Sequence, residues 1–292
     1  MRNSLEVIGL ESLGTIRVRG PDAVRFLQGQ LSNDVTKLTA AEPMLAGFHN
    51  PQGRTIALLR LVLWDSDDIL ALLPRELAAP VAQRLARFVL RSKVKIADES
   101  QAWRLLGLHE QGTGAVRQAI DPPARCFRVG ESRWLIIAPI DAPVPAINTA
   151  EAIWDRLEVE SGLAQVYAST TEEFVAQMLN LDALQAISFE KGCYTGQEVI
   201  ARAHYRGRVK RRMQRFISRD PCVVEPGLSG QLADGRTFKV VRAAKLEDGR
   251  CDFLAVTNIA NDESVSPEPS TEPAERTIVY ADPAQLPYAL PV

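Results

Sequence analysis

The chain has 292 residues, enough for two or three subdomains with buried cores. Its composition, 46% hydrophobic and 24% charged residues, is typical of a soluble globular protein, and a net charge of −2 excludes a general attraction to nucleic acid or acidic membranes. No apolar run is long enough to span a membrane, and residues 1–14 contain no uninterrupted apolar segment, so we expect a cytoplasmic protein.

The cysteines and histidines do not form a metal-binding pattern. They are scattered along the chain without a CxxC pair (Cys126, Cys193, Cys222, Cys251, His49, His109 and His204). The sequence therefore predicts no metal site, and reduced thiols suit the expected compartment.

The first elements are a short strand at residues 15–18, a Gly-Pro-Asp turn and a helix. The apolar residues of the helix fall three or four positions apart: Val24, Leu27 and Leu31. Asn33 and Asp34 then end the helix, and Asp34 is interpreted as a turn or cap residue.

Residues 55–64 and 69–73 are apolar runs separated by a polar turn, which predicts a hairpin of buried strands. A helix is predicted over residues 75–91. Its apolar face would hold Leu77, Val81, Leu85, Phe88 and Val89.

A second important helix is predicted from Thr149 to a stop signal at Gly162. Trp154 on this helix is either a core residue or a ring on which a planar ligand stacks. Glu160 is either solvated or accepts hydrogen bonds from such a ligand.

Residues 189–202 concentrate the reactive chemistry of the chain. Lys191, Cys193, Gln197 and Glu198 lie close together, and Gly192 and Gly196 enclose Cys193 and Tyr194, which predicts a tight loop. A lysine near a thiol can lower the pKa of the thiol. Cys193 is therefore either a reactive thiol or a small buried hydrophobic residue.

Basic residues follow this loop, with no acid between residues 199 and 217. Seven cations lie in fourteen residues: Arg202, Arg206, Arg208, Lys210, Arg211, Arg212 and Arg215. Strand-like alternation would place Arg206, Arg208 and Lys210 on one face. This face is a solvated surface, a site for carboxylates or a site for RNA phosphates.

The remainder of the chain consists of short strands. They are predicted at residues 213–217, 230–232, 238–246 and 251–257, with an Asp-Gly hairpin turn at residues 247–249. The pattern predicts a small antiparallel barrel.

Residues 191–198, with the sequence KGCYTGQE, resemble the signature of the YgfZ family of folate-binding proteins, which are related to the T-protein (aminomethyltransferase) of the glycine cleavage system. Residues 180–182, 187–189 and 199–212 extend the similarity. The resemblance implies an α+β, aminomethyltransferase-like folate-binding fold with a C-terminal antiparallel β-barrel. Residues 1–208 would form two interleaved α+β subdomains of the folate-binding region, and residues 209–292 the barrel.

The resemblance also implies a ligand and a task. Tetrahydrofolate would bind to Trp154, Glu160, Arg202 and Arg206, and Cys193 would be the functional thiol, tuned by Lys191 and Glu198. The implied function is that of an accessory protein for the assembly or repair of iron-sulfur clusters in specific enzymes, including enzymes that modify tRNA. Expected partners are the folate and the client enzymes, with neither direct nucleic-acid binding nor a membrane.

Two departures from the T-protein bear on activity. Ala57 and Leu58 stand where the T-protein has two aspartates, so we expect no aminomethyltransferase activity, and Glu158 stands where it has a basic residue. An alternative is a folate-dependent one-carbon transferase or demethylase using Asp34 or Glu160 as a base. A third hypothesis is an RNA-binding module at residues 202–215. The sequence leaves open the role of folate, the client enzymes, the exposure of Cys193 and the oligomeric state.

Overall fold

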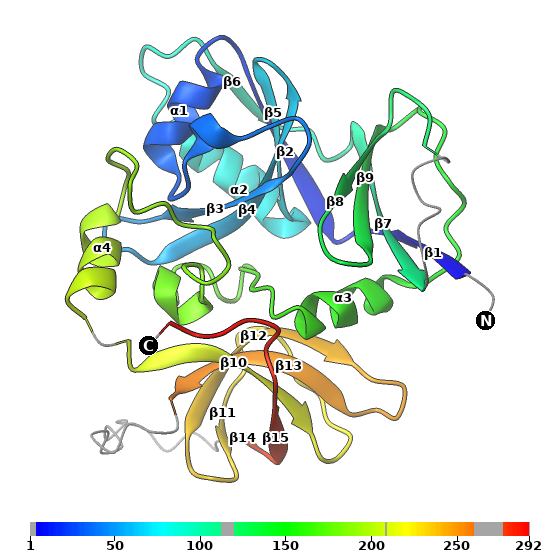
Figure 1. Cartoon of the computed structure of the whole chain (residues 1–292), viewed down its shortest axis with the longest axis vertical. Coiled ribbons are helices and arrows are strands. Elements are labelled where there is room, and N and C mark those ends of the chain that lie inside the picture. Colours follow the sequence, from blue (N-terminus) through cyan, green and yellow to red (C-terminus); the bar gives the residue numbers. More distant parts are fainter. Residues whose placement is uncertain (1–3, 112–119, 208, 260–276, 292) are drawn as a thin grey trace. The chain divides into compact units, whose positions relative to one another are not determined.

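The computed structural model describes residues 4–111, 120–207, 209–259 and 277–291 (Figure 1). The chain divides into two compact units. Unit 1 comprises Met1–His49, Ile56–Trp154 and Ala186–Thr195, and unit 2 comprises Asn50–Thr55, Asp155–Gln185 and Gly196–Val292. A domain boundary after residue 208 stays a prediction.

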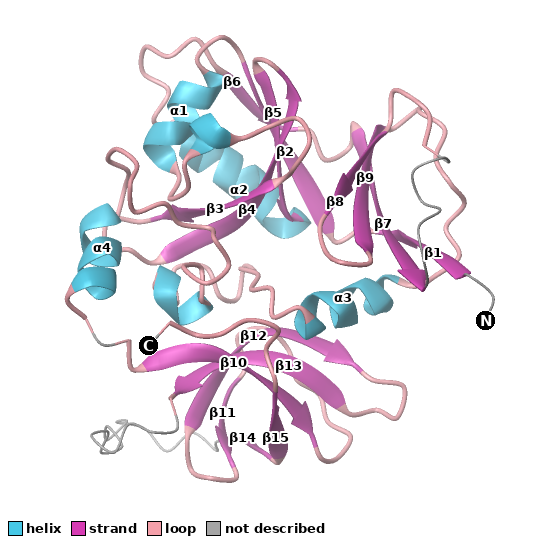
Figure 2. Cartoon of the chain, viewed as in Figure 1, coloured by secondary structure: helices cyan, strands magenta, loops and turns pink. Residues whose placement is uncertain are grey.

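Unit 1 contains a five-stranded sheet in the order β3-β4-β5-β2-β6 (Figure 2). Its strands are β2 (Leu13–Arg19), β3 (Met44–His49), β4 (Thr55–Asp65), β5 (Asp68–Pro74) and β6 (Lys95–Asp98). β4 and β5 pair antiparallel, which confirms the predicted hairpin. The helical elements of this part are α1 (Ala23–Gln30), η1 (Val35–Lys37) and α2 (Arg75–Ala86).

Unit 1 also contains a four-stranded antiparallel sheet, in the order β1-β7-β9-β8. The strands are β1 (Ser4–Gly9), β7 (Trp103–Gln111), β8 (Arg125–Arg128) and β9 (Arg133–Pro139). The helix α3 (Glu151–Glu160) follows; Trp154 is the last residue of this segment to belong to unit 1.

Unit 2 is built on a six-stranded, barrel-like sheet in the order β14-β11-β12-β13-β10-β15. The strands are β10 (Arg211–Ser218), β11 (Ser229–Leu232), β12 (Thr237–Lys245), β13 (Cys251–Asn258), β14 (Thr277–Val279) and β15 (Ala281–Ala284). At its core the Phe216 ring stacks on that of Phe253, and the Phe238 ring packs tilted against Phe253. The unit also contains η3 (Ala176–Leu179) and α4 (Gln197–Tyr205). The predicted α+β class with a C-terminal barrel is confirmed.

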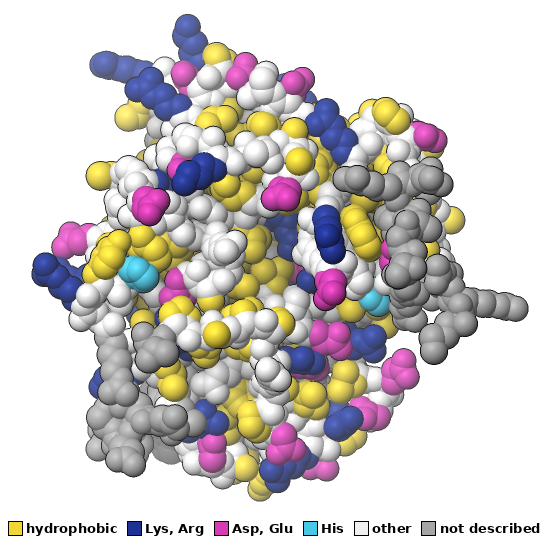
Figure 3. All heavy atoms as spheres, viewed as in Figure 1, with side chains coloured by type: hydrophobic (Ala, Val, Ile, Leu, Met, Phe, Trp, Pro, Cys, Tyr) yellow, Lys and Arg dark blue, Asp and Glu magenta, His cyan; other side chains and the backbone are white. Residues whose placement is uncertain are grey.

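Basic and acidic side chains are intermixed on the face of the molecule that Figure 3 shows. Within the described residues, no helix is long and apolar enough to cross a membrane.

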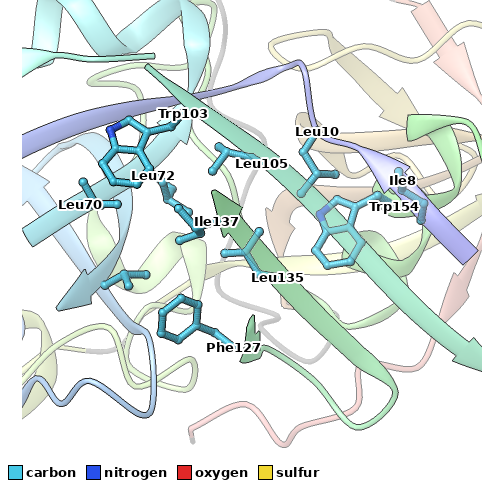
Figure 4. Packing of buried hydrophobic residues seen from close by; sticks show 11 residues of the cluster. Ile8, Leu10, Leu70, Leu72, Trp103, Leu105, Phe127, Leu135, Ile137 and Trp154 are labelled. Carbon is cyan, nitrogen blue, oxygen red and sulfur yellow. The ribbon is translucent and has the colours of Figure 1, made fainter. Parts of the chain in front are cut away.

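One hydrophobic core of unit 1 joins side chains from both of its sheets (Figure 4). Leu70 and Leu72 come from β5, whereas Leu105 and Leu135 come from β7 and β9. Trp154 closes this cluster and is only 4% exposed. Its indole lies directly over Gly107, where a β-carbon would come within 2.3 Å of the ring.

The helix predicted over residues 75–91 begins at Arg75 as expected, but its predicted end is wrong: α2 ends at Ala86, and Phe88 is 44% exposed, because the buried positions stop at Leu85. α4 ends at Tyr205 and β10 begins only at Arg211, so the described residues between them lie in no strand.

Substitution of Gly107 by Ala should destabilise unit 1 by about 2–3 kcal/mol, because the new methyl group overlaps the indole of Trp154. All four tryptophans lie in unit 1, so urea unfolding followed by tryptophan fluorescence measures this directly. Gly29→Ala is the control: Gly29 lies in α1 with no atom within 4 Å of the added carbon, and should gain about 0.5–1 kcal/mol. Equal stabilities of the two variants would contradict the packing.

Candidate functional site

Cys193 is exposed to solvent on a loop of unit 1 that has neither helix nor strand. Tyr194, the next residue, is buried with 8% of its surface exposed. The interpretation of Cys193 as a small buried hydrophobic residue is therefore wrong. The loop presents the thiol, as the alternative interpretation expected.

The two glycines of the signature differ in their roles. Gly196 has φ of +82°, and a β-carbon there would lie 2.5 Å from the backbone oxygen of Asn50, so only glycine fits. Gly192 has no atom within 4 Å of such a carbon and no positive φ. The expected backbone requirement is met at Gly196 but not at Gly192.

The ammonium of Lys191 is buried against the end of α1. Its Nζ donates to the backbone oxygens of Gln28 (2.6 Å), Leu31 (2.6 Å) and Asn33 (2.9 Å). These acceptors include carbonyls of the helix C-terminus, which attract positive charge. An ammonium has three N–H donors, so all of them are used.

The position of Lys191 changes its expected role. The sequence suggested a lysine that tunes the Cys193 thiol, whereas the structure commits the ammonium to the carbonyls of α1. Burial lowers the pKa of Lys191 to about 8, against the opposing effect of the Asp34 carboxylate. Lys191 is thus an anchor that ties the loop to α1.

Two neutral rings support the same loop. The Tyr194 ring lies with its centroid 5.1 Å from Lys191 Nζ and 6.4 Å from the His49 ring. His49 is 1% exposed, and neither of its ring nitrogens has a hydrogen-bond partner among the described residues. Burial lowers the pKa of His49 to about 3 and raises that of Tyr194 to about 12, so both rings are uncharged at neutral pH.

Asp34 acts as a cap, as the sequence indicated. Its carboxylate accepts hydrogen bonds from the backbone N–H of Thr36 and from the Gln28 amide, at the start of η1. The hydrogen bond from the Thr36 side chain is the largest cause of a lowered pKa for Asp34, which burial partly opposes. A lowered pKa makes Asp34 a weaker base.

The second half of the signature belongs to unit 2. Gln197 and Glu198 form the first turn of α4, and Glu198 lies 3.1 Å from Arg202 in an exposed i, i+4 ion pair. Arg206 follows the helix and is exposed. Arg208, another member of the basic run, lies outside the described residues.

Two cations of the basic run are structural. Arg212 donates to both carboxylate oxygens of Asp182 (3.0 and 2.9 Å) and is 3% exposed. Arg215 forms a similar pair with Asp252, which raises the pKa of Arg215 although burial opposes the change. Asn180 completes the arrangement by donating to the Met213 backbone oxygen (2.8 Å). The motif at residues 180–182 therefore fixes β10.

Trp154 and Glu160 occupy very different surroundings on α3. The Trp154 indole is packed in the core, with the Arg133 guanidinium 5.7 Å from the ring centroid. Glu160 is exposed, and its carboxylate lies 3.6 Å from Arg156. An indole enclosed in this way offers no free face, so stacking of a pterin would require the core to open. The folate roles of Trp154, Glu160, Arg202 and Arg206 stay predictions.

A buried ion cluster of unit 2 was not identified from the sequence. Arg242 donates to Glu158 (3.1 Å) and Asp155 (2.9 Å), and is 5% exposed. Burial acts against its charge, but Tyr167, Glu158 and Asp155 raise the pKa of Arg242. The i, i+3 spacing of Asp155 and Glu158 was the available indication, because such residues share one helix face.

Among the described residues, no three His, Cys, Asp or Glu side chains gather in a way that could hold a metal ion. Cys251 is buried and donates to the backbone oxygen of Cys222 (3.2 Å), and Cys126 is half-buried. Cys193 is therefore the one described cysteine that is classed as exposed.

No family model matches the chain. The tRNA-modifying protein YgfZ of Edwardsiella ictaluri is 32% identical over 86% of this chain and 84% of its own, and that of Klebsiella pneumoniae is 30% identical over 88% and 86%. An uncharacterised protein of Haemophilus influenzae is 34% identical over 71% of this chain and 72% of its own. Aminomethyltransferase T of the glycine cleavage system of Bartonella henselae is similar in structure, with a TM-score of 0.67 at 15% identity over 89% of this chain and 80% of its own.

Replacement of Lys191 by Met should destabilise unit 1 by about 2–4 kcal/mol, because three buried carbonyls lose their donor. Urea unfolding at pH 7, monitored by tryptophan fluorescence, measures the change. Lys210→Met, which alters an exposed lysine, is the control.

The pH dependence offers a second check on Lys191. Its pKa is about 8 in the folded chain and about 10.4 in the unfolded chain, so the unfolded chain binds more protons between these values. The free energy of unfolding of the wild type should therefore rise relative to that of Lys191→Met as the pH increases from 8 to 10. A constant difference over this range would place the ammonium in water.

Proposed function

We proceed from the finding that this chain belongs to the family of the tRNA-modifying protein YgfZ, and we propose that it is a tetrahydrofolate-binding accessory protein for iron-sulfur enzymes. Its clients would include enzymes that modify tRNA, and its task would be the assembly or repair of their clusters. The relatives show the family, whereas the folate ligand, the iron-sulfur clusters and the identity of the client enzymes are proposals.

The observation that carries the proposal is the exposure of Cys193 on an anchored loop. A thiol that reacts with a partner protein must be accessible, and a thiol that reacts at a defined place must be held in position. Lys191 supplies the position, because its three hydrogen bonds fix the backbone two residues before Cys193. The exposed side chain then remains free to meet a client.

Cluster chemistry at Cys193 would have to be shared. Iron-sulfur clusters usually take four protein ligands, and Cys193 supplies one. The thiol would release its proton to solvent and bind iron as a thiolate, while the client provides the other ligands. Cys193 would then hold the cluster only while the two proteins are in contact.

The residues proposed for folate fit the ligand only in part. Arg202 and Arg206 expose guanidinium groups at α4, which can bind the carboxylates of a folate tail. Trp154 in its core position does not fit as a stacking platform. Arg202 and Arg206 are therefore the members of the proposed site whose exposure and charge suit a folate carboxylate.

Transfer of an aminomethyl group is not expected. Ala57 and Leu58 lie on β4, are at most 2% exposed and carry no acidic or basic group. The alternative of a one-carbon transferase or demethylase needs a base, and Asp34 is engaged as a cap with a lowered pKa. Nothing in the surroundings of Asp34 favours this alternative over an accessory role.

A Cys193→Ser variant tests the central role. In a bacterial strain that lacks its own family member, the wild-type protein should restore a tRNA modification made by an iron-sulfur enzyme, measured by mass spectrometry of nucleosides. Cys193→Ser should leave the modification at the level of the deletion strain. Cys222→Ser, at a half-buried thiol of unit 2, should restore it. Full restoration by Cys193→Ser at equal protein level would refute the role of this thiol.

Calorimetric titration with tetrahydrofolate tests the ligand separately. We expect saturable binding by the wild type and about tenfold weaker binding by Arg206→Ala, which removes one charge-assisted hydrogen bond. Arg219→Ala, which breaks an exposed pair with Asp282 in the C-terminal sheet, should bind as the wild type does. Absence of binding by the wild type would remove folate from the proposal and leave the Cys193 experiment unaffected.

A further inference from the structure

A second basic stretch lies in unit 1, outside the residues discussed so far. Residues 77–97 contain no Asp or Glu and carry five cations: Arg84, Arg87, Arg91, Lys93 and Lys95. In Figure 3, Lys and Arg side chains project at the end of the view where α1 and β6 are labelled in Figure 1. The net charge of −2 hides this local excess of positive charge.

Three of these cations form an exposed row. Arg91, Lys93 and Lys95 are exposed, whereas Ser92, Val94 and Ile96 between and after them are half-buried. The backbone turns within this segment, because Arg91 lies at a bend and the backbone N–H of Val94 donates to the backbone oxygen of Ser92 (2.9 Å). The row leads into β6, which is an edge strand of the five-stranded sheet.

The row is not neutralised within unit 1. The structure gives no ion pair between the side chains of Arg91, Lys93 or Lys95 and any described residue. Lys95 lies directly opposite Arg19 on β2, a like-charge pair that destabilises a sheet. Asp68, on the other side of Arg19, is engaged by Arg17. Asp22 accepts a hydrogen bond from the backbone N–H of Lys93.

Ordinary structural roles explain only part of the stretch. Arg84 and Arg87 lie at the C-terminus of α2, where cations are favoured by the helix dipole. Lys95 on an edge strand discourages pairing with another sheet. Neither role applies to Arg91 and Lys93, nor to Leu90, which is 88% exposed beside them.

We propose that the row formed by Arg91, Lys93 and Lys95 binds the phosphate backbone of RNA. Three neighbouring exposed cations, one of them opposite another cation on β2, are complementary in charge to a run of phosphates. The partly exposed ring of Phe88 could stack on an unpaired base. A short run of cations suits a polymer of anions better than a flat anionic membrane, into which only Phe88 and Leu90 of this stretch could insert.

This inference does not depend on the proposed function. It also concerns a surface other than residues 202–215, the RNA site that the sequence suggested, where Arg212 and Arg215 pair with Asp182 and Asp252. The expectation of no direct nucleic-acid contact is therefore revised for a different surface, on unit 1.

Fluorescence anisotropy with a labelled RNA hairpin that has a single-stranded loop tests the row. The triple variant Arg91→Gln, Lys93→Gln, Lys95→Gln should bind about tenfold or more weakly at 100 mM salt. Loss of three phosphate contacts should also reduce the slope of log K against log salt concentration by about 2 to 3. The matched control is Arg219→Gln, Lys245→Gln, Arg250→Gln in unit 2, which removes the same charge and should bind as the wild type does.

A second variant tests the row in case the triple variant prevents β6 from folding. Arg87→Gln, Arg91→Gln alters cations outside the strand and should reduce the salt slope by about 1 to 2. Absence of RNA binding by the wild type at 50 mM salt would overturn the proposal. So would equal weakening in the unit 2 control, or binding to vesicles of phosphatidylglycerol and phosphatidylcholine but not to RNA. If the triple variant only aggregates and Arg87→Gln, Arg91→Gln binds normally, the row serves edge protection instead.

Discussion

The loop that carries Cys193 depends on the burial of one ammonium group. Removing an ion from water costs several kcal/mol unless its surroundings replace the lost hydration. At Lys191 the replacement comes from three backbone carbonyls at the end of α1, which also require donors because a helix C-terminus leaves its last carbonyls unpaired. Each side supplies hydrogen bonds that the other needs, although burial still lowers the pKa of Lys191 to about 8. A segment without regular structure thereby gains a fixed place on unit 1.

This arrangement separates the position of the thiol from its burial. A cysteine held by its own packing would be inaccessible, as Cys251 is. In the signature, Lys191 and Tyr194 are buried on either side of the exposed Gly192 and Cys193. The buried contacts of Lys191 and Tyr194 therefore offset the conformational entropy that the loop loses, and the side chain of Cys193 stays exposed. A chemical role that requires contact with another protein needs both properties.

The sequence predicts those features that depend on neighbours in the chain. The hairpin of β4 and β5, the cap at Asp34 and the strands of the barrel follow from local patterns. Features that depend on distant partners were not predictable. Arg212 meets Asp182, 30 residues earlier, and Arg215 meets Asp252, 37 residues later, so a run of cations resembled a surface. Trp154 could not be assigned either, because a core indole and a stacking indole present the same residue on the same helix face.

The two basic stretches show why charge density in a sequence does not locate an anion site. Residues 202–215 carry more cations, but Arg212 and Arg215 pair with carboxylates that are themselves buried. Residues 91–95 carry fewer, yet like charges face each other across β2 and β6. A fold tolerates such repulsion where water screens it, and an anionic partner would relieve it. Internal pairing, and not the number of cations, therefore separates the described cations that are committed to the fold from those that are open to an anionic ligand.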